Sequence, residues 1–313
     1  MSATAVRPWT APAAVVSAVL PARLEASRQG RIHSLYRSAI DVVLPNGDLI
    51  VIADPALGGL PNGVLVDLGP DHRRLGLGPD QPVFLGARSI EVPAIGLRIS
   101  LDSAVRWSPE LAVAHDGASL RWRGRSRSVR THAAAGARLG EPVACEGLGG
   151  LLTADRPRAL PIHAARAAAV LDQLAAALPT DDVDAAGRIA RRLVGLGPGL
   201  TPSGDDALIG LAAALRAMGH PAQGFLDEAI DDAAVRTTAV AASLLRHAAA
   251  GEFSERLQRL LGALLGDDDA PIAPAIEQAV AWGATSGTDC LVGVLLGLDI
   301  AAAPVPQAAG FTR

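Results

Sequence analysis

The sequence predicts an α+β protein, in which an N-terminal antiparallel β domain or small barrel is followed by an all-helical C-terminal domain. Two observations lead to this prediction. The first half of the chain consists of short apolar runs separated by turn residues, whereas the second half consists of alanine- and leucine-rich stretches at helical spacing. The helical stretches follow one another without strand-like runs, which argues against a parallel nucleotide-binding sheet. We predict a mainly β domain over residues 1–150 and a helical domain over residues 151–313.

The β prediction starts from a hairpin signal. Two strand-like runs, residues 33–45 and 48–54, flank the dipeptide Asn46–Gly47. This dipeptide is typical of tight hairpin turns because both residues tolerate a positive φ. Further strand-like runs follow at residues 63–69, 82–93 and 97–107.

The helical prediction rests on stretches in which apolar residues recur every three or four positions, with Gly or Pro near their ends. They cover residues 161–178, 181–197, 203–219, 236–251, 253–266, 274–283 and 287–299.

Composition excludes several kinds of chemistry. All 28 basic residues of the 313-residue chain are arginines. Without lysine, the chain cannot form a Schiff base with pyridoxal phosphate, a Walker A phosphate site, or a biotinyl or lipoyl attachment. A net charge of -4 argues against general nucleic-acid binding, although arginines cluster between Arg121 and Arg130. We expect that segment to be a solvated loop or an edge strand.

The sequence also predicts a cytoplasmic protein without a membrane segment. The apolar N-terminal run is broken by Pro12 and Pro21, which argues against a secretory signal. The most apolar late segment, residues 291–303, contains a charged residue and is too short to cross a bilayer. Cys145 and Cys290 lack metal-ligand spacing, so we expect neither a zinc site nor a disulfide framework.

One short pattern begins two of the predicted helices. Residues 203–210 and 286–293 both read Ser-Gly-x-Asp-x-Leu-x-Gly. Each copy fits an ordinary helix start, in which serine is the N-cap and the aspartate three residues later favours the helix dipole. Capping does not explain the glycine after each serine, because glycine inside a helix costs about 1 kcal/mol relative to alanine. Its benefit would be close approach of the backbone to a ligand or to another segment.

Each motif helix has a face on which an aspartate is followed by small residues at intervals of four positions. The two sets are Asp206, Gly210 and Ala214, and Asp289, Gly293 and Gly297. Small residues at this spacing let helices cross closely, so we expect the faces to pack and to bring both N-termini to one cavity. Free N–H groups and two positive dipole ends would there attract an anion.

The candidate anion-binding residues include hydroxyls and glycines of both motifs and of a third, hydroxyl-rich helix. They are Gly197, Gly199, Thr201, Ser203, Gly204, Thr237, Thr238, Ser286 and Gly287. The third helix also fits ordinary alanine-rich packing.

These segments resemble a known bacterial family. The matching stretches are GLGPGLTPSGDDALIG at residues 195–210, TTAVAASLLRHAAAGEF at 237–253 and GATSGTDCLVGVLLG at 283–297, with weaker matches at 30–52 and 60–68. They are similar to the AllH-like family, which includes a subunit of oxamate carbamoyltransferase in anaerobic allantoin breakdown, a route of purine degradation. The resemblance implies a subunit of a complex that converts oxalurate and phosphate to oxamate and carbamoyl phosphate, or the reverse. It also implies two partner proteins, one of them related to acyl-CoA synthetases.

Three aspartates are the candidate catalytic groups of this site. Asp205, Asp206 and Asp289 are candidates for binding a divalent cation such as Mg²⁺, for general-base catalysis, or for supporting other groups. The cofactor stays unknown at this point. Two alternative functions also stay open: a stand-alone metal-dependent hydrolase using Asp206 and Asp289, and a scaffold subunit without chemistry of its own.

Two short segments resemble motifs of ordinary ornithine and aspartate carbamoyltransferases. SVRTH at residues 128–132 is similar to their STRTR phosphate loop, and HPAQ at residues 220–223 is similar to their HPxQ motif. Those motifs lie on doubly wound α/β domains, whereas Gly219-His220-Pro221 here follows a helix as an ordinary stop. We therefore assign neither segment a catalytic role.

Overall fold

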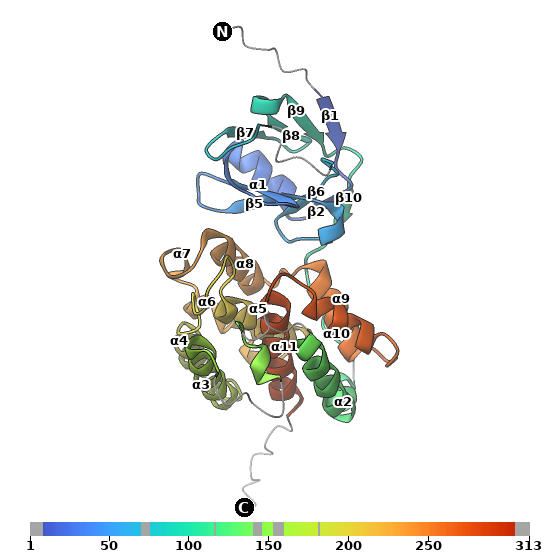
Figure 1. Ribbon diagram of the computed structural model, residues 1–313, viewed down its shortest axis with the longest axis vertical. Coiled ribbons are helices and arrows are strands. Elements are labelled where there is room, and N and C mark those ends of the chain that lie inside the picture. Colours follow the sequence, from blue (N-terminus) through green and yellow to red (C-terminus); the bar gives the residue numbers. More distant parts are fainter. Residues whose placement is uncertain are drawn as a thin grey trace, which may run out of the picture. The chain divides into compact units, whose positions relative to one another are not determined.

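The structure is a computed structural model that describes residues 9–69, 76–115, 117–139, 146–152, 160–180 and 182–303. The chain forms two compact units, Met1–Glu110 with Ala250–Gln258, and Leu111–Ala249 with Arg259–Arg313. The first is a β unit and the second is helical (Figure 1), which confirms the predicted α+β class. Cys145 lies outside the described residues. Among the helices in the described ranges, none is both long and apolar enough to cross a membrane.

The β unit is built on one ten-stranded sheet with the order β1-β9-β8-β7-β3-β4-β5-β6-β2-β10. Most neighbouring strands are antiparallel, as predicted, but β1–β9, β5–β6 and β2–β10 pair in parallel. The elements of this unit are β1 (Trp9–Pro12), β2 (Val15–Ser17), α1 (Leu20–Ser27), β3 (Gln29–Leu35), β4 (Ala39–Val43), β5 (Leu49–Ala53), η1 (Pro55–Leu57), β6 (Gly63–Leu65), β7 (Pro82–Leu85), β8 (Ser89–Val92), η3 (Pro93–Ile95), β9 (Leu97–Ser100) and β10 (Val105–Trp107).

The two ends of the sheet are joined by its first two strands. β1 pairs with β9 at one end, whereas β2 pairs with β6 and β10 at the other. Only Ala13 and Ala14 separate β1 from β2. The Ala13 N–H donates to Ser100 O (2.9 Å), and the Ala14 N–H donates to Leu65 O (2.8 Å). The sheet therefore curls toward a barrel, and its core is aliphatic.

The predicted hairpin at Asn46–Gly47 is confirmed. It joins β4 to β5, which pair antiparallel from Ala39–Ala53 to Val43–Leu49. Gly47 has a φ of 84° and its N–H donates to Leu44 O (2.9 Å). Glycine is suited to this conformation because it has no Cβ to clash.

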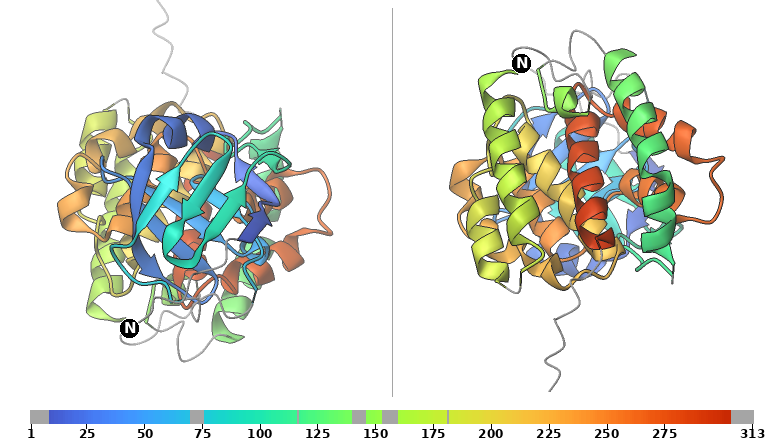
Figure 2. Two further views of the ribbon diagram at one scale, coloured as in Figure 1. Left: turned by 90° about the horizontal axis from the view of Figure 1, so that it is seen from above. Right: turned by 90° about the horizontal axis from the view of Figure 1, so that it is seen from below.

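Each of the seven predicted helical stretches overlaps a helix. The helical unit comprises α2 (Ala118–Leu139), η5 (Gly149–Leu151), α3 (Ile162–Ala177), α4 (Val183–Ala190), α5 (Ser203–Ala217), η6 (Pro221–Gly224), α6 (Leu226–Ala229), α7 (Ala233–Arg236), α8 (Ala239–Ala249), α9 (Glu255–Leu265), α10 (Ile272–Val280) and α11 (Ser286–Ala302). The first four residues of α9 belong to the β unit. α5 and α11 pack together at the centre, with α2 and α10 against α11 and with α8 against α5 (Figure 2).

The arginine-rich segment forms helix α2, so the expectation of a loop or edge strand is wrong. Trp122, Val129 and Ala133 are buried along one side of this helix. The Trp122 Nε1–H also donates to Asp299 Oδ1 of α11 (2.9 Å). Because α2 packs within the helical unit, the β unit ends at Glu110, well before the boundary expected after residue 150.

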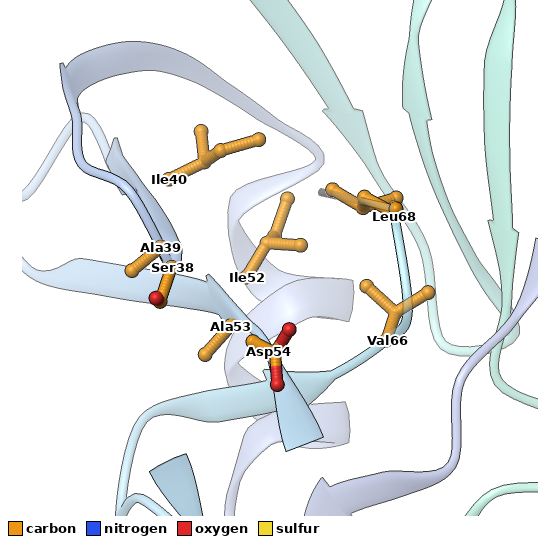
Figure 3. A pocket seen from close by; sticks show the side chains of 9 residues that line it. Ser38, Ala39, Ile40, Ile52, Ala53, Asp54, Val66 and Leu68 are labelled. Carbon is orange, nitrogen blue, oxygen red and sulfur yellow. The ribbon is translucent and has the colours of Figure 1, made fainter. Parts of the chain in front are cut away.

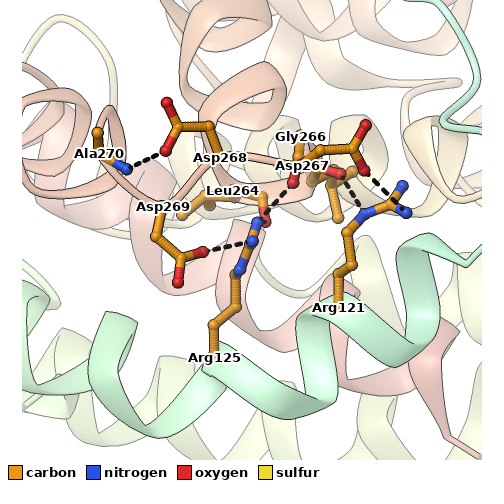
Figure 4. Close-up of polar contacts among 9 residues, drawn as sticks. Arg121, Arg125, Leu264, Gly266, Asp267, Asp268, Asp269 and Ala270 are labelled. Carbon is orange, nitrogen blue, oxygen red and sulfur yellow. Dashed lines mark hydrogen bonds and ion pairs between the residues drawn. The ribbon is translucent and has the colours of Figure 1, made fainter.

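The arginines of α2 satisfy the C-terminal end of α9 (Figure 4). Arg125 donates to Leu264 O (3.2 Å) and Gly266 O (2.7 Å), and Arg121 donates to Leu265 O (3.0 Å). The last carbonyl groups of a helix have no partner within it and carry partial negative charge. These guanidinium groups therefore act as a cap supplied by another helix.

Candidate functional site

The candidate site begins with the crossing of α5 and α11 through glycines. A Cβ on Gly210 would lie 2.0 Å from Cys290 O, and a Cβ on Gly293 would lie 1.9 Å from Ala207 O. Such distances leave no room for a methyl group, so only glycine fits at either position. The relationship is reciprocal because Ala207 and Cys290 are equivalent residues of the two motif copies. The predicted packing of the two small-residue faces is confirmed.

The glycine after each motif serine packs against the chain that precedes its helix. A Cβ on Gly204 would lie 2.1 Å from Leu193 O, and a Cβ on Gly287 would lie 1.8 Å from Ala279 O. The Gly204 N–H donates to Leu196 O (2.8 Å). In the same way, the Gly287 N–H donates to Trp282 O (3.0 Å). The close approach that these glycines permit is therefore to another segment of the chain.

The motif serines are not the N-caps that the sequence predicted. The N-cap positions are Pro202 and Thr285, and neither makes a side-chain capping hydrogen bond. The serine hydroxyls instead bond across the two motifs: Ser286 to Asp206, and Ser203 to Asp289. Polar partners on the facing helix thus replace local capping. The two predicted helix N-termini therefore meet.

A further hydroxyl joins this exchange from the loop before α5. Thr201 Oγ1 lies 2.8 Å from Ser286 Oγ, and Thr201 also hydrogen bonds to Asp206. Thr201 and Ser286 are only partly buried, whereas Ser203 is 1% exposed. Both hydroxyls that bond to Asp206 therefore belong to partly exposed residues.

Asp206 and Asp289 are buried close to each other. Asp206 is 7% exposed and Asp289 is 0% exposed. Burial raises the pKa of Asp206 well above its usual value, and the negative charge of Asp289 raises it further, against hydrogen bonds that lower it. Burial also raises the pKa of Asp289. In both carboxyl groups, Oδ2 is buried without a hydrogen-bond partner among the described residues.

Asp289 is covered by a segment that the sequence did not identify as part of the site. The Leu148 N–H donates to Asp289 Oδ1 (2.5 Å), and a Cβ on Gly147 would lie 2.5 Å from the same oxygen. His163 of α3 lies 2.7 Å from Glu146 O, and its positive charge lowers the pKa of Asp289. Glycines at residues 147, 149 and 150 are a weak signal of close approach, but they do not identify what is approached.

Asp205 has a different environment from the other two aspartates. Its Oδ1 accepts the Gly195 N–H (2.9 Å), and its Oδ2 accepts the Thr237 hydroxyl (2.5 Å). Burial raises its pKa, and these two hydrogen bonds lower it. Both oxygens are therefore engaged in holding the chain before α5 and the chain before α8.

The other predicted loop and hydroxyl residues lie around the start of α5. Gly197 and Gly199 have φ values of 121° and 100°, which favour glycine. Thr238 Oγ1 donates to Leu200 O (2.5 Å) and accepts the Ala241 N–H (3.1 Å) at the start of α8. Thr237 and Thr238 thus fix the loop and α8 next to α5.

Neither carbamoyltransferase-like segment is at this site. HPAQ follows the C-terminal end of α5, which is about 20 Å from its N-terminal end for a helix of this length. His220 Nδ1 accepts the Ala222 N–H (3.2 Å) as a local cap. SVRTH lies within α2, and its His132 ring bonds to Ser128 O (2.8 Å). Within the described part of the chain, no group of three or more His, Cys, Asp or Glu side chains is arranged to hold a metal ion.

Two cavities lie elsewhere in the molecule. A small one of about 10 Å³ in the β unit, near Ile52, Asp54 and Leu68, has room for about one water molecule (Figure 3). An open groove of about 420 Å³ in the helical unit is lined largely by acidic side chains of α4, α6 and the following turn. Neither includes residues of the two motifs.

The protein is thus an α+β protein with a curled β unit and a helical unit. The helical unit buries two aspartates at a duplicated helix start. Residues 193–298, which contain both motif copies, match a family model described as oxamate carbamoyltransferase subunit AllH. Residues 12–106 match a model described as AllH family N-terminal domain. The chain therefore belongs to the AllH family, as its sequence motifs indicated. No solved structure matches it.

Proposed function

We propose that this chain is a subunit of a cytoplasmic oxamate carbamoyltransferase-like complex that interconverts oxalurate plus phosphate and oxamate plus carbamoyl phosphate. The observation behind the proposal is that the family matches include most of the β unit and the whole segment carrying both motifs. The name of the matched family supports the role of a subunit. We further propose that one of its partner proteins is related to acyl-CoA synthetases.

The chemistry of this transfer requires a proton acceptor. In the direction of oxalurate formation, the amide nitrogen of oxamate attacks the carbonyl carbon of carbamoyl phosphate. A C–N bond forms, the C–O bond to phosphate breaks, and the nitrogen loses one proton. A carboxylate whose pKa is raised is a more effective general base than an ordinary aspartate. We propose Asp206 for this role because it is the less deeply buried of the two motif aspartates.

Anion binding is assigned to groups other than the first amides of the two helices. The N–H groups of Gly204, Asp205, Asp206, Gly287 and Asp289 already donate to backbone carbonyls. We propose that the partly exposed hydroxyls of Thr201 and Ser286 contact the anionic substrate, together with the loop at Gly197 and Gly199. The positive ends of α5 and α11 favour negative charge nearby.

Asp205 is proposed as a positioning residue. Both of its oxygens accept hydrogen bonds from the protein, which leaves it poorly suited to act on substrate. The alternative of a metal-dependent hydrolase using Asp206 and Asp289 has less support, because no group of three or more His, Cys, Asp or Glu side chains in the described ranges is arranged to hold a metal ion.

Reconstitution tests the proposed function. The purified chain is mixed with its partner subunits, and formation of carbamoyl phosphate from oxalurate and phosphate is measured. We expect turnover only in the complete mixture, with a loss of about 100-fold or more for Asp206→Asn, as is typical when a general base is removed. Asp172→Asn on the exposed side of α3 is the matched control and should retain full activity. Full activity of the complex with Asp206→Asn would favour a scaffold role.

A further inference from the structure

Two buried oxygens at the candidate site lack the donors that such atoms require. Asp206 Oδ2 and Asp289 Oδ2 are both inaccessible to solvent and have no hydrogen-bond partner among the described residues. Buried polar atoms in folded proteins are nearly always paired, and an unpaired carboxylate oxygen is particularly costly. The other hydrogen bonds of these carboxyl groups come from Ser286 and Thr201 to Asp206, and from Leu148, Ser203 and Thr285 to Asp289, so the two side chains are well fixed.

The charge of the site restricts what can pair with these oxygens. A negatively charged group is disfavoured in direct contact with the two carboxylate oxygens, and a carbonyl or ether oxygen offers no donor. A cation or a group with N–H donors satisfies both requirements. A metal ion is the weaker candidate, because no cluster of three or more acidic, His or Cys side chains surrounds the pair within the described ranges.

The internal repeat favours a donor with two equivalent hydrogens. Asp206 and Asp289 occupy the same position in the two motif copies, and each receives a hydroxyl from the opposite copy. Their unpaired oxygens therefore belong to equivalent residues on two crossing helices. The NH₂ group of a primary amide carries two N–H donors on one nitrogen, whereas a secondary amide or a hydroxyl carries only one.

We infer that Asp206 Oδ2 and Asp289 Oδ2 together form a two-point acceptor for the NH₂ group of a primary amide. The identity of that amide rests on the proposed function, in which oxamate carries such a group at the reacting nitrogen. One carboxylate receives the proton that nitrogen loses as the C–N bond forms, while the other keeps the second N–H in place. Phosphate leaves with the electron pair of the broken C–O bond.

Calorimetric binding to the full chain, alone and with its partner subunits, tests this inference. The probes are oxamate with two amide N–H donors, N-methyloxamate with one, and N,N-dimethyloxamate and oxalate with none. We expect oxamate to bind most tightly, and the two probes without N–H donors to bind at least about tenfold more weakly. Asp206→Asn and Asp289→Asn should each weaken oxamate binding by a similar factor, and Asp172→Asn should not.

Three results would overturn the inference. Oxalate or N,N-dimethyloxamate binding as tightly as oxamate would show that the NH₂ group is not what the site recognises. Binding of Mg²⁺ alone that is lost in Asp206→Asn would show a cation site. Failure of all four probes to bind, alone or with the partners, would also exclude it.

The outcome is separable from that of the proposed function. If the complex transfers carbamoyl groups but does not prefer oxamate over oxalate, the function stands and the two-point acceptor fails. If oxamate binds with the expected preference but the complete mixture has no transferase activity, the acceptor stands and the function fails.

Discussion

Asp206 and Asp289 occupy equivalent positions in two copies of one helix start, and each accepts a hydrogen bond from the serine of the other copy. The serines are free for this exchange because they do not cap their own helices. Two carboxyl groups are thereby buried close together, at a cost in folding free energy. Replacing such buried carboxyl groups usually stabilises a protein. Their presence therefore indicates that function requires them.

Asp206→Asn is accordingly expected to stabilise the fold. At neutral pH the buried Asp206 carboxyl either ionises in a low-dielectric site or takes up a proton, and both cost free energy relative to the unfolded chain. Asparagine has nearly the same shape and no charge. We expect the free energy of unfolding to rise by about 1 kcal/mol or more, as when other buried charged groups are replaced. Urea unfolding at pH 7 measures this change, with Asp172→Asn as the control. An unchanged or lowered stability of Asp206→Asn would contradict the proposed cost of burying the carboxyl group.

The dependence of stability on pH should show the same destabilising effect of the two buried carboxyl groups. The pKa of Asp206 and that of Asp289 are raised in the folded protein above their usual value of 3.8. Between 3.8 and the raised pKa, the folded state binds more protons than the unfolded state, so this contribution to stability falls as pH rises. Above the raised pKa, the penalty is fully present and constant.

We therefore expect the wild-type protein to lose stability relative to the Asp206→Asn/Asp289→Asn double variant as pH rises through that window. Arginine-paired acids such as Asp102 and Asp232, whose pKa is lowered, contribute the opposite slope at lower pH. Comparing wild type with the double variant removes their contribution. Parallel stability curves from pH 4 to pH 8 would show that the two carboxyl groups do not titrate as their burial indicates.

The sequence could predict the fold class and the meeting of the two helix starts because both depend on local or repeated patterns. Turn residues and periodicity are local, and small residues at intervals of four appear in both copies. The serine contacts were predicted incorrectly because a local cap and a partner on another helix compete for the same hydroxyl. Only the fold reveals that partner.

Other parts of the site and fold depend on contacts between distant segments. Leu148, whose N–H donates to Asp289, lies 141 residues away from it along the chain. The neighbouring Gly147 packs against the same carboxylate. Helix α2 has too few apolar residues for a clear helical pattern. Its arginines are accounted for by the carbonyl groups at the end of α9, which sequence reasoning could not place beside them.

The crossing of α5 and α11 makes a direct prediction for glycine substitutions. Gly210→Ala or Gly293→Ala would place a methyl group within about 2 Å of a backbone oxygen, and neither helix can move without disturbing both aspartates. We expect each variant to lose about 1–3 kcal/mol of stability, as for overpacked cores. Gly262→Ala in α9 is the matched control because its Cβ would meet nothing within 4 Å.

The control should change stability in the opposite direction. Alanine is favoured over glycine inside a helix, so Gly262→Ala is expected to gain about 0.5–1 kcal/mol. Thermal and urea unfolding of the three variants measure the expected losses and the expected gain of stability. Tolerance of alanine at Gly210 and Gly293 would contradict the close crossing on which the position of the site depends.

Arg125 of helix α2 is expected to stabilise the helical unit by capping the end of α9. This side chain donates to Leu264 O and Gly266 O and pairs with Asp269, and it is largely buried. Arg125→Met keeps the aliphatic part but leaves the carbonyl groups at the end of α9 without these donors, so we expect a loss of about 1–3 kcal/mol. Arg127→Met, on the exposed side of the same helix, should change stability by less than about 0.5 kcal/mol. Urea unfolding distinguishes the two, and equal effects would mean that the arginines of α2 act through overall charge instead of through the end of α9.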